Sequence, residues 1–145
     1  IQGLETLSLR MERHNANAQQ VAEFLAQHPQ VERVQYAGLT DSPWHERAKA
    51  ITAGRGYGSV PAFVIAGGRE AGAKFVEGLT LHSHVANIGD VRSLAIHPAS
   101  TTHSQLTAEE QVTTGVDPGL VRLSVGLETI DDIITDLERG FAAAK

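Results

Sequence analysis

The sequence predicts an α+β domain in which a small mixed sheet of about four strands is covered by helices. Three observations lead to this prediction. Apolar residues recur with helical spacing near the beginning, the middle and the end of the chain. Short apolar segments of strand length lie between them at 31–36, 62–66 and 120–125. The connections are irregular, which favours α+β over a regular succession of β-α-β units.

The first half of the chain is expected to hold three helices and two strands. A long helix over 4–25 is predicted by one unbroken apolar stripe, and Pro29 ends it. A strand over 31–36, a short helix over 44–51 and a buried strand over 62–66 follow. Gly67 and Gly68 then turn the chain into a second amphipathic helix, whose apolar positions are Ala71, Phe75, Val76 and Leu79.

The second half is expected to begin with a strand near 83–88 and an extended segment through Ile96. A polar loop over 98–105 precedes a helical turn that Thr107 caps, with Glu110 completing a capping box. A strand over 120–125 leads to the last helix, capped by Thr129. The acidic residues in its first turn suit the positive end of the helix dipole; they are Asp131 and Asp132.

Composition excludes several classes of protein. The 145 residues carry 12 Lys and Arg against 17 Asp and Glu, a net charge of −5, which argues against a nucleic-acid partner. The absence of cysteine excludes disulfides, thiol catalysis and cysteine-bound metal. No apolar run approaches the length of a membrane span, so no membrane partner is expected. The chain opens on Ile1 and is expected to be a piece of a longer protein.

Histidines and glycines offer two candidate sites, each with a simpler interpretation. His82 and His84 would face the same side of a strand, near His97 and His103, yet their spacing lacks a familiar ligand pattern. Hydrogen-bonding or surface histidines are the favoured interpretation, and no metal is expected. The Gly67-Gly68 turn resembles a phosphate-binding turn but lacks its motifs, so a structural turn is favoured.

Two further features could line a binding site. The segment 97–104 holds four hydroxyls and two imidazoles, which suits either a solvated loop or a polar pocket. Arg122 lies within an apolar strand, where alternation places it on the face opposite Val121 and Leu123. A guanidinium on a rigid strand matches the two oxygens of a carboxylate. An ordinary exposed strand arginine is the alternative.

Three segments together resemble the C-terminal part of the Cys/Met-metabolism enzymes that use pyridoxal phosphate, and they occur in the family's order. They are Gly3-Leu4-Glu5-Thr6-Leu7 with Arg10-Met11 and His14-x-x-Asn17-Ala18; His97-Pro98-Ala99-Ser100-Thr101-Thr102-His103; and Val121-Arg122-Leu123-Ser124-Val125-Gly126-Leu127-Glu128. The resemblance covers essentially the whole chain, and the last two segments are its most specific part.

The resemblance implies the small C-terminal domain of an aspartate-aminotransferase-type (fold type I) enzyme. Residues 1–28 would be a connecting helix from a large domain outside this chain, and 29–145 the small domain. The family's Ser-x-x-Lys segment is missing, and none of the three lysines, Lys49, Lys74 and Lys145, lies in such a setting. The chain alone is therefore expected to hold no catalytic residue and to be inactive, with the large domain as its partner and the main holder of the cofactor.

Within the family, Asn87 and the Thr101–Leu106 segment look like the O-acetylhomoserine sulfhydrylase branch, which makes homocysteine for methionine biosynthesis. By motif position, Arg122 would bind the substrate α-carboxylate, Asn87 would help to hold it, and Thr102 would lie near the cofactor–substrate edge. The resemblance also implies a cytoplasmic homotetramer acting on a small molecule. Cystathionine γ-synthase, a γ-lyase and a non-catalytic module that binds a small acid remain alternatives.

Overall fold

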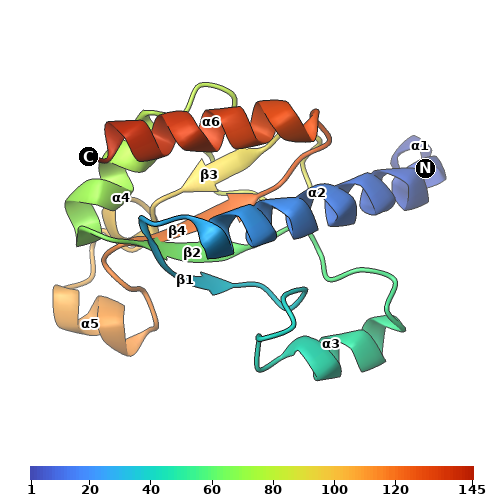
Figure 1. Cartoon of the computed structure of the whole chain (residues 1–145), viewed down its shortest axis with the longest axis horizontal. Coiled ribbons are helices and arrows are strands. Elements are labelled where there is room, and N and C mark those ends of the chain that lie inside the picture. Colours follow the sequence, from blue (N-terminus) through green and yellow to red (C-terminus); the bar gives the residue numbers. More distant parts are fainter.

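A four-stranded sheet with three helices packed on one face forms the body of the molecule (Figure 1). The structure is a computed structural model that describes residues 1–145. No helix is both long enough and apolar enough to cross a membrane. In chain order the elements are α1 (Gln2–Glu5), α2 (Leu7–Gln27), β1 (Val31–Gln35), α3 (His45–Thr52), β2 (Ala62–Ile65), α4 (Gly68–Glu77), β3 (Leu94–Ile96), the 3-10 helix η1 (Pro98–Ser100), α5 (Ala108–Thr113), β4 (Leu120–Ser124) and α6 (Ile130–Ala143).

The α+β fold class and the number of strands are confirmed. The strand order is β1-β2-β4-β3 and every neighbouring pair is antiparallel. The sheet is therefore less mixed than expected, since its parallel component is a single bridge between Ser83 and Leu94. β4 lies inside the sheet, where Arg122 pairs with Ala62 of β2 on one side and with Ile96 of β3 on the other.

The strand expected near 83–88 is wrong, and the third strand is Leu94–Ile96 instead. Val85 and Ile88 are apolar residues of this segment, but their side chains are 50% and 61% exposed. Only Ser83 pairs with β3, and beyond it the chain turns away from the sheet. Gly89, at φ +73°, takes a left-handed conformation that glycine adopts without strain, so the segment turns instead of extending.

The core lies between the sheet and α2, α4 and α6, which Figure 1 shows on the same side of the strands. Strand residues Phe63, Val121 and Leu123 point into it and are fully buried. Phe75 of α4 and Phe141 of α6 meet there with ring centroids 4.8 Å apart. This face of the sheet is therefore occupied, and a charged strand residue can be accommodated only on the opposite face.

The long first helix is confirmed, with a break at Thr6 that separates α1 from α2. Only its C-terminal half is covered: Ala18, Val21 and Leu25 are fully buried, whereas Leu4 is 72% exposed. His28 takes an extended conformation before Pro29, which ends the helix as predicted.

The predicted starts of the helices are confirmed. The expected capping hydrogen bond is present at one of the two predicted threonine caps and absent at the other. Thr107 and Glu110 form the expected capping box at α5, with the Glu110 carboxylate 2.8 Å from the Thr107 N–H. Thr129 precedes α6 as expected, but its side chain makes no capping hydrogen bond. Gly67 and Gly68 have positive φ and turn β2 directly into α4, which is the structural turn that the sequence favoured.

Candidate functional site

Arg122 lies in the middle of β4 on the face of the sheet opposite the helices. Its neighbours Val121 and Leu123 are fully buried in the core, so alternation turns the Arg122 side chain to the other face, where it is half-buried. Its Nη2 donates a hydrogen bond to the backbone carbonyl oxygen of Asn87 at 3.1 Å. Its Nε is buried without a hydrogen-bond partner. Since a guanidinium carries five donors in a planar fork, Arg122 retains donors for a carboxylate ligand.

Asn87 lies in a loop, residues 83–93, whose ends are hydrogen-bonded to one another. The Ser83 N–H donates to the Ser93 carbonyl oxygen, and the Ala95 N–H donates to the Ser83 carbonyl oxygen, both at 3.0 Å. The loop brings the Asn87 carbonyl to Arg122, whereas the Asn87 side-chain Oδ1 accepts from the Ile88 N–H at 2.9 Å. The structure thus brings these two predicted site residues together through the Asn87 backbone.

Thr102, the third predicted site residue, lies in the turn after η1 and does not contact Arg122. Its Oγ1 is 2.9 Å from His103 Nδ1. It lines a hollow of about 230 Å³ at the edge of β3, together with His84, His97 and Ser100. Ile96 of β3 also lines this hollow and pairs with Arg122 of β4, so one strand borders both the hollow and the Arg122 position.

His97 supports the polar loop and is buried. Its Nδ1 is 2.8 Å from Ser100 Oγ and its Nε2 is 2.7 Å from the Pro118 carbonyl oxygen. Burial lowers the pKa of His97 below its ordinary value, which keeps the ring neutral. A Cβ on Gly72 would lie 2.6 Å from this ring, so the helix α4 approaches it closely at a glycine. His97 is therefore a hydrogen-bonding histidine, which is the interpretation the sequence favoured.

Asp136 is a buried carboxylate that the sequence analysis did not single out. It accepts hydrogen bonds from the Thr80 N–H at 2.8 Å, from the His82 N–H at 3.0 Å and from His82 Nδ1 at 2.8 Å. Burial alone would raise the pKa of Asp136, but these hydrogen bonds outweigh it and hold the pKa well below its usual range. The sequence feature that could have identified Asp136 is its place on the apolar face of the last helix, between Ile133 and Leu137.

His82 is consequently tied to α6 through its Nδ1, while its Nε2 is buried without a hydrogen-bond partner. Its side chain is fully buried, and burial lowers its pKa. His84, which was expected to share its face of a strand, is exposed instead. No group of three or more His, Asp or Glu side chains is arranged to hold a metal ion.

Two polar residues fasten the long helix α2 to the segment after β4. His14 Nδ1 is 2.7 Å from the Val125 carbonyl oxygen. Asn17 Nδ2 donates to the carbonyl oxygens of Gly126 at 3.0 Å and Glu128 at 2.9 Å. These contacts join two of the segments that carried the family resemblance, which gives that resemblance a structural basis.

Comparison with known proteins agrees with this geometry. A family model described as "Cys/Met metabolism PLP-dependent enzyme" matches residues 1–142. The chain belongs to this family. It is 57% identical over 144 residues to the O-acetyl-L-homoserine sulfhydrylase of Corynebacterium glutamicum, covering 99% of this chain and 32% of that protein. It is 49% identical over 140 residues to an L-methionine gamma-lyase of Fusobacterium nucleatum, covering 97% of this chain and 35% of that protein.

A solved structure confirms the fold. The cystathionine gamma synthase of Xanthomonas oryzae superposes with a TM-score of 0.85 at 39% identity, over 99% of this chain and 36% of that one. The chain thus spans about a third of the length of the relatives it matches. The resemblance to this pyridoxal-phosphate family that the sequence indicated is confirmed.

Pyridoxal phosphate is the cofactor of this family, but the residues of this chain do not form a site for it. Lys74 lies on α4, on the face of the sheet opposite Arg122, and its Nζ forms an ion pair with Glu70 Oε1 at 2.8 Å. Lys49 lies on α3 and Lys145 is the last residue. No lysine therefore lies where it could join the cofactor beside Arg122. The candidate ligand-binding group of this chain is the Arg122 guanidinium, which has donors without a hydrogen-bond partner.

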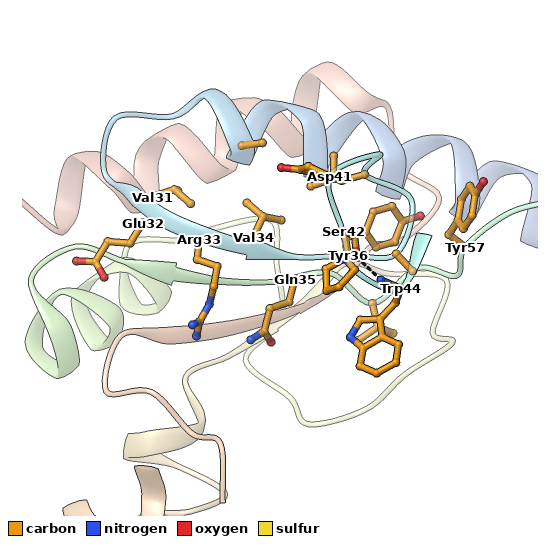
Figure 2. Close-up of a pocket in the computed structure, with 15 residues that line it drawn as sticks. Val31, Glu32, Arg33, Val34, Gln35, Tyr36, Asp41, Ser42, Trp44 and Tyr57 are labelled. Carbon is orange, nitrogen blue, oxygen red and sulfur yellow. Dashed lines mark hydrogen bonds between the residues drawn. The ribbon is translucent and has the colours of Figure 1, made fainter. Parts of the chain in front are cut away.

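A larger hollow than that beside Thr102 lies elsewhere, along the edge strand β1 (Figure 2). It has a volume of about 900 Å³ and is open to solvent. In Figure 2, Val31 and Val34 point to one side of β1 while Arg33 and Gln35 point to the other. Arg122, Asn87 and Thr102 do not line it. The hollow is a groove beside an unpaired strand edge, and the arrangement of donors that could bind a substrate acid lies at β4.

Proposed function

We propose that this chain is the substrate-binding C-terminal part of an O-acetylhomoserine sulfhydrylase. The reaction is O-acetyl-L-homoserine plus sulfide to L-homocysteine plus acetate, a step of methionine biosynthesis. Residues 29–145 are the small domain, and 1–28 are the helix that connects it to a large domain, which holds pyridoxal phosphate. The enzyme is a cytoplasmic homotetramer in this proposal.

The observation that carries the proposal is the identity to the sulfhydrylase over nearly the whole chain, which exceeds the identity to the γ-lyase. The half-buried guanidinium of Arg122 supports it, because every substrate of this kind is an α-amino acid. A carboxylate bound by two parallel N–H donors is held in position as well as in orientation. Partial burial strengthens such a charge-assisted pair compared with one in water.

Each predicted site residue has a role in this proposal. Arg122 binds the substrate α-carboxylate. Asn87 orients the guanidinium through its carbonyl oxygen and presents its side chain at the mouth of the site. Thr102 lines the neighbouring hollow, where a hydroxyl can contact the edge of the substrate and cofactor. None of the three transfers a proton in this account, since catalysis requires residues outside this chain.

The test uses the longer enzyme that contains residues 1–145. Initial rates are measured with O-acetyl-L-homoserine and either sulfide or cysteine, and with L-methionine alone. The sulfhydrylase proposal expects kcat/KM to be higher with sulfide than with cysteine, and elimination from L-methionine to be slow. Higher kcat/KM with cysteine would assign the chain to cystathionine γ-synthase, and rapid elimination from L-methionine would assign it to a γ-lyase.

A spectrum distinguishes both from a non-catalytic binding module. Absorbance of the bound cofactor in the longer protein, lost on treatment with borohydride, is expected for the enzyme. A protein without that absorbance that still binds a small acid through Arg122 would favour the binding module.

A further inference from the structure

We propose that Glu128 is a positioning residue for substrate binding: its carboxylate clasps Ser93 and thereby holds the 83–93 loop against Arg122. The inference rests on the proposed function, since it concerns how the Arg122 site is maintained. Glu128 itself makes no contact with Arg122 and would not touch the substrate. Glu128 would affect substrate binding only by fixing the position of the 83–93 loop.

The clasp consists of three short hydrogen bonds around a buried serine. The Ser93 N–H donates to Glu128 Oε1 at 2.7 Å, and Ser93 Oγ donates to Glu128 Oε2 at 2.8 Å. Ser93 Oγ accepts in turn from the Gly126 N–H at 2.9 Å. Ser93 is fully buried, so these groups have no water to replace a lost partner. A carboxylate acceptor makes each of the two Glu128 bonds stronger than a neutral one.

Gly126 leaves the space in which the clasp closes. A Cβ at this position would lie 2.5 Å from Ser93 N and from the Arg92 carbonyl carbon, and would also collide with the Glu128 carboxylate. A real Cβ does not approach other atoms so closely, and two of these neighbours are backbone. The loop and the segment after β4 therefore meet more closely than any side chain at 126 would allow.

The clasp ties the loop to the strand that carries Arg122. Glu128 follows β4, and the Leu127 N–H also donates to the Val91 carbonyl oxygen at 2.9 Å. At the other end of the loop, Asp136 holds His82. Between these two anchors the loop meets the site through the hydrogen bond that Arg122 Nη2 donates to the Asn87 carbonyl oxygen. Releasing the Ser93 end would therefore free Asn87 to move away from the guanidinium.

Hydrogen exchange in the longer enzyme tests the first step. Peptides that cover 84–92 should exchange faster in Glu128→Ala than in the unmodified enzyme, because the loop loses its C-terminal anchor. Glu128→Gln should fall between them, since its amide oxygen can still accept one of the two bonds. Glu138→Gln is the matched control, because Glu138 is exposed on α6 and faces His28 at 3.8 Å, away from this loop.

Steady-state kinetics test the second step. Loss of hydrogen bonds to a charged group predicts a KM for O-acetyl-L-homoserine raised about tenfold in Glu128→Ala. The KM for sulfide, which has no carboxylate, should stay unchanged, and kcat should fall less than the KM rises. Gly126→Ala should raise the same KM by displacing the clasp. A residue that merely stabilised the fold would lower the amount of active enzyme and leave both KM values in place.

The outcomes separate this inference from the proposed function. If the unmodified enzyme does not use O-acetyl-L-homoserine, the proposed function fails. If it does, and Arg122→Ala raises the KM while Glu128→Ala leaves both that KM and the loop exchange unchanged, the positioning role of Glu128 is overturned. Faster exchange with an unchanged KM overturns it as well. Should Glu128→Ala not fold, Glu128→Gln and Gly126→Ala decide by the same two measurements.

Discussion

The guanidinium of Arg122 donates to the backbone carbonyl oxygen of Asn87 across 3.1 Å, so a strand residue and a loop residue 35 positions apart share one site. The contact uses one donor of Arg122 and leaves its buried Nε without a partner. Buried donors in folded proteins are nearly always bonded. The unpaired Nε of this half-buried guanidinium is therefore available to an acceptor, and a carboxylate has the two acceptors that the fork requires.

Replacing Arg122 in the longer enzyme should weaken substrate use without loss of the cofactor. Losing a hydrogen bond to a charged group costs roughly 1.5–3 kcal/mol, so Arg122→Ala should lower kcat/KM with O-acetylhomoserine about ten- to a hundredfold. Arg122→Lys keeps the charge but not the planar fork and should recover part of the loss. The measurement is steady-state kinetics together with the cofactor absorbance, which should not change. A kcat/KM near that of the unmodified enzyme in Arg122→Ala would return Arg122 to the role of an ordinary strand residue.

The buried pair of His82 and Asp136 should make the stability of the chain depend on pH. Burial holds the pKa of His82 below its ordinary value of 6.5, so the unfolded chain binds a proton more readily than the folded one. The stability contributed by neutral His82 is therefore complete above pH 6.5 and is lost as the pH falls toward the lowered pKa. Such a group lowers the free energy of unfolding by at most about 1.4 kcal/mol per pH unit.

Urea unfolding of residues 1–145 between pH 7 and pH 5 measures this effect. His82→Gln should flatten the decline, leaving the part that the buried His97 contributes. His84→Gln is the comparison: His84 is exposed two residues further on, but its charge helps to lower the pKa of His82, so this variant should change the slope less than His82→Gln does. Asp136 acts in a separate window: its lowered pKa stabilises the fold above the ordinary carboxyl range and ceases to do so in stronger acid. Equal slopes for all three proteins would show that His82 does not titrate on unfolding.

The apolar residues at the start of the chain predict dye binding by residues 1–145. Leu4 is 72% and Leu7 39% exposed, and both belong to the stripe whose later members are buried. Neighbouring apolar side chains on one exposed helix face are a surface to which a hydrophobic dye or another protein surface can bind. Leu4→Gln with Leu7→Gln should lower the fluorescence of a bound hydrophobic dye. Ile51→Gln, at a residue that is 73% exposed on another helix, should change it little. A chain that binds no dye before substitution would contradict the prediction.

The sequence predicted most elements because their signals are local. The stripe from Leu4 to Leu25, the apolar strands and the capping box at Thr107 each follow from periodicity or from a short motif. The strand near 83–88 was wrong for the same reason. Val85 and Ile88 have the composition of a strand, but whether an apolar side chain is covered depends on segments distant in the chain.

The positions of the candidate site residues in the fold were predicted in part, for a related reason. Alternation in 120–125 placed Arg122 on the open face, and the family motif identified Asn87. The contacts that hold them could not be predicted, since Ser93 meets Glu128 and His82 meets Asp136 across 35 and 54 positions. The residues next to Glu128 or Asp136 in the sequence do not indicate which distant residue each carboxylate bonds. Their buried polar groups can be paired only once the fold is known.

Gly140 lies on α6 where this helix packs closely against Phe75 of α4. In the interior of an exposed helix, replacing glycine by alanine stabilises the helix by about 0.5–1 kcal/mol. At Gly140 the added Cβ would lie 2.8 Å from Phe75 Cε2 and 2.9 Å from Leu79 Cδ2, in the core between the two helices. Overpacking a core in this way costs about 1–3 kcal/mol, so the net change should be destabilising.

Urea unfolding of Gly140→Ala should therefore give a lower free energy of unfolding than that of the unmodified chain, whereas Gly3→Ala, which meets nothing within 4 Å, should not. Leu79→Ala opens space beside Gly140, so the cost of Gly140→Ala should shrink when the two are combined. Contacting residues commonly show such coupling, of about 0.5–3 kcal/mol in a double-mutant cycle. If Gly140→Ala instead raised the stability, or if its effect simply added to that of Leu79→Ala, the close approach of the two helices would not be what requires glycine at this position.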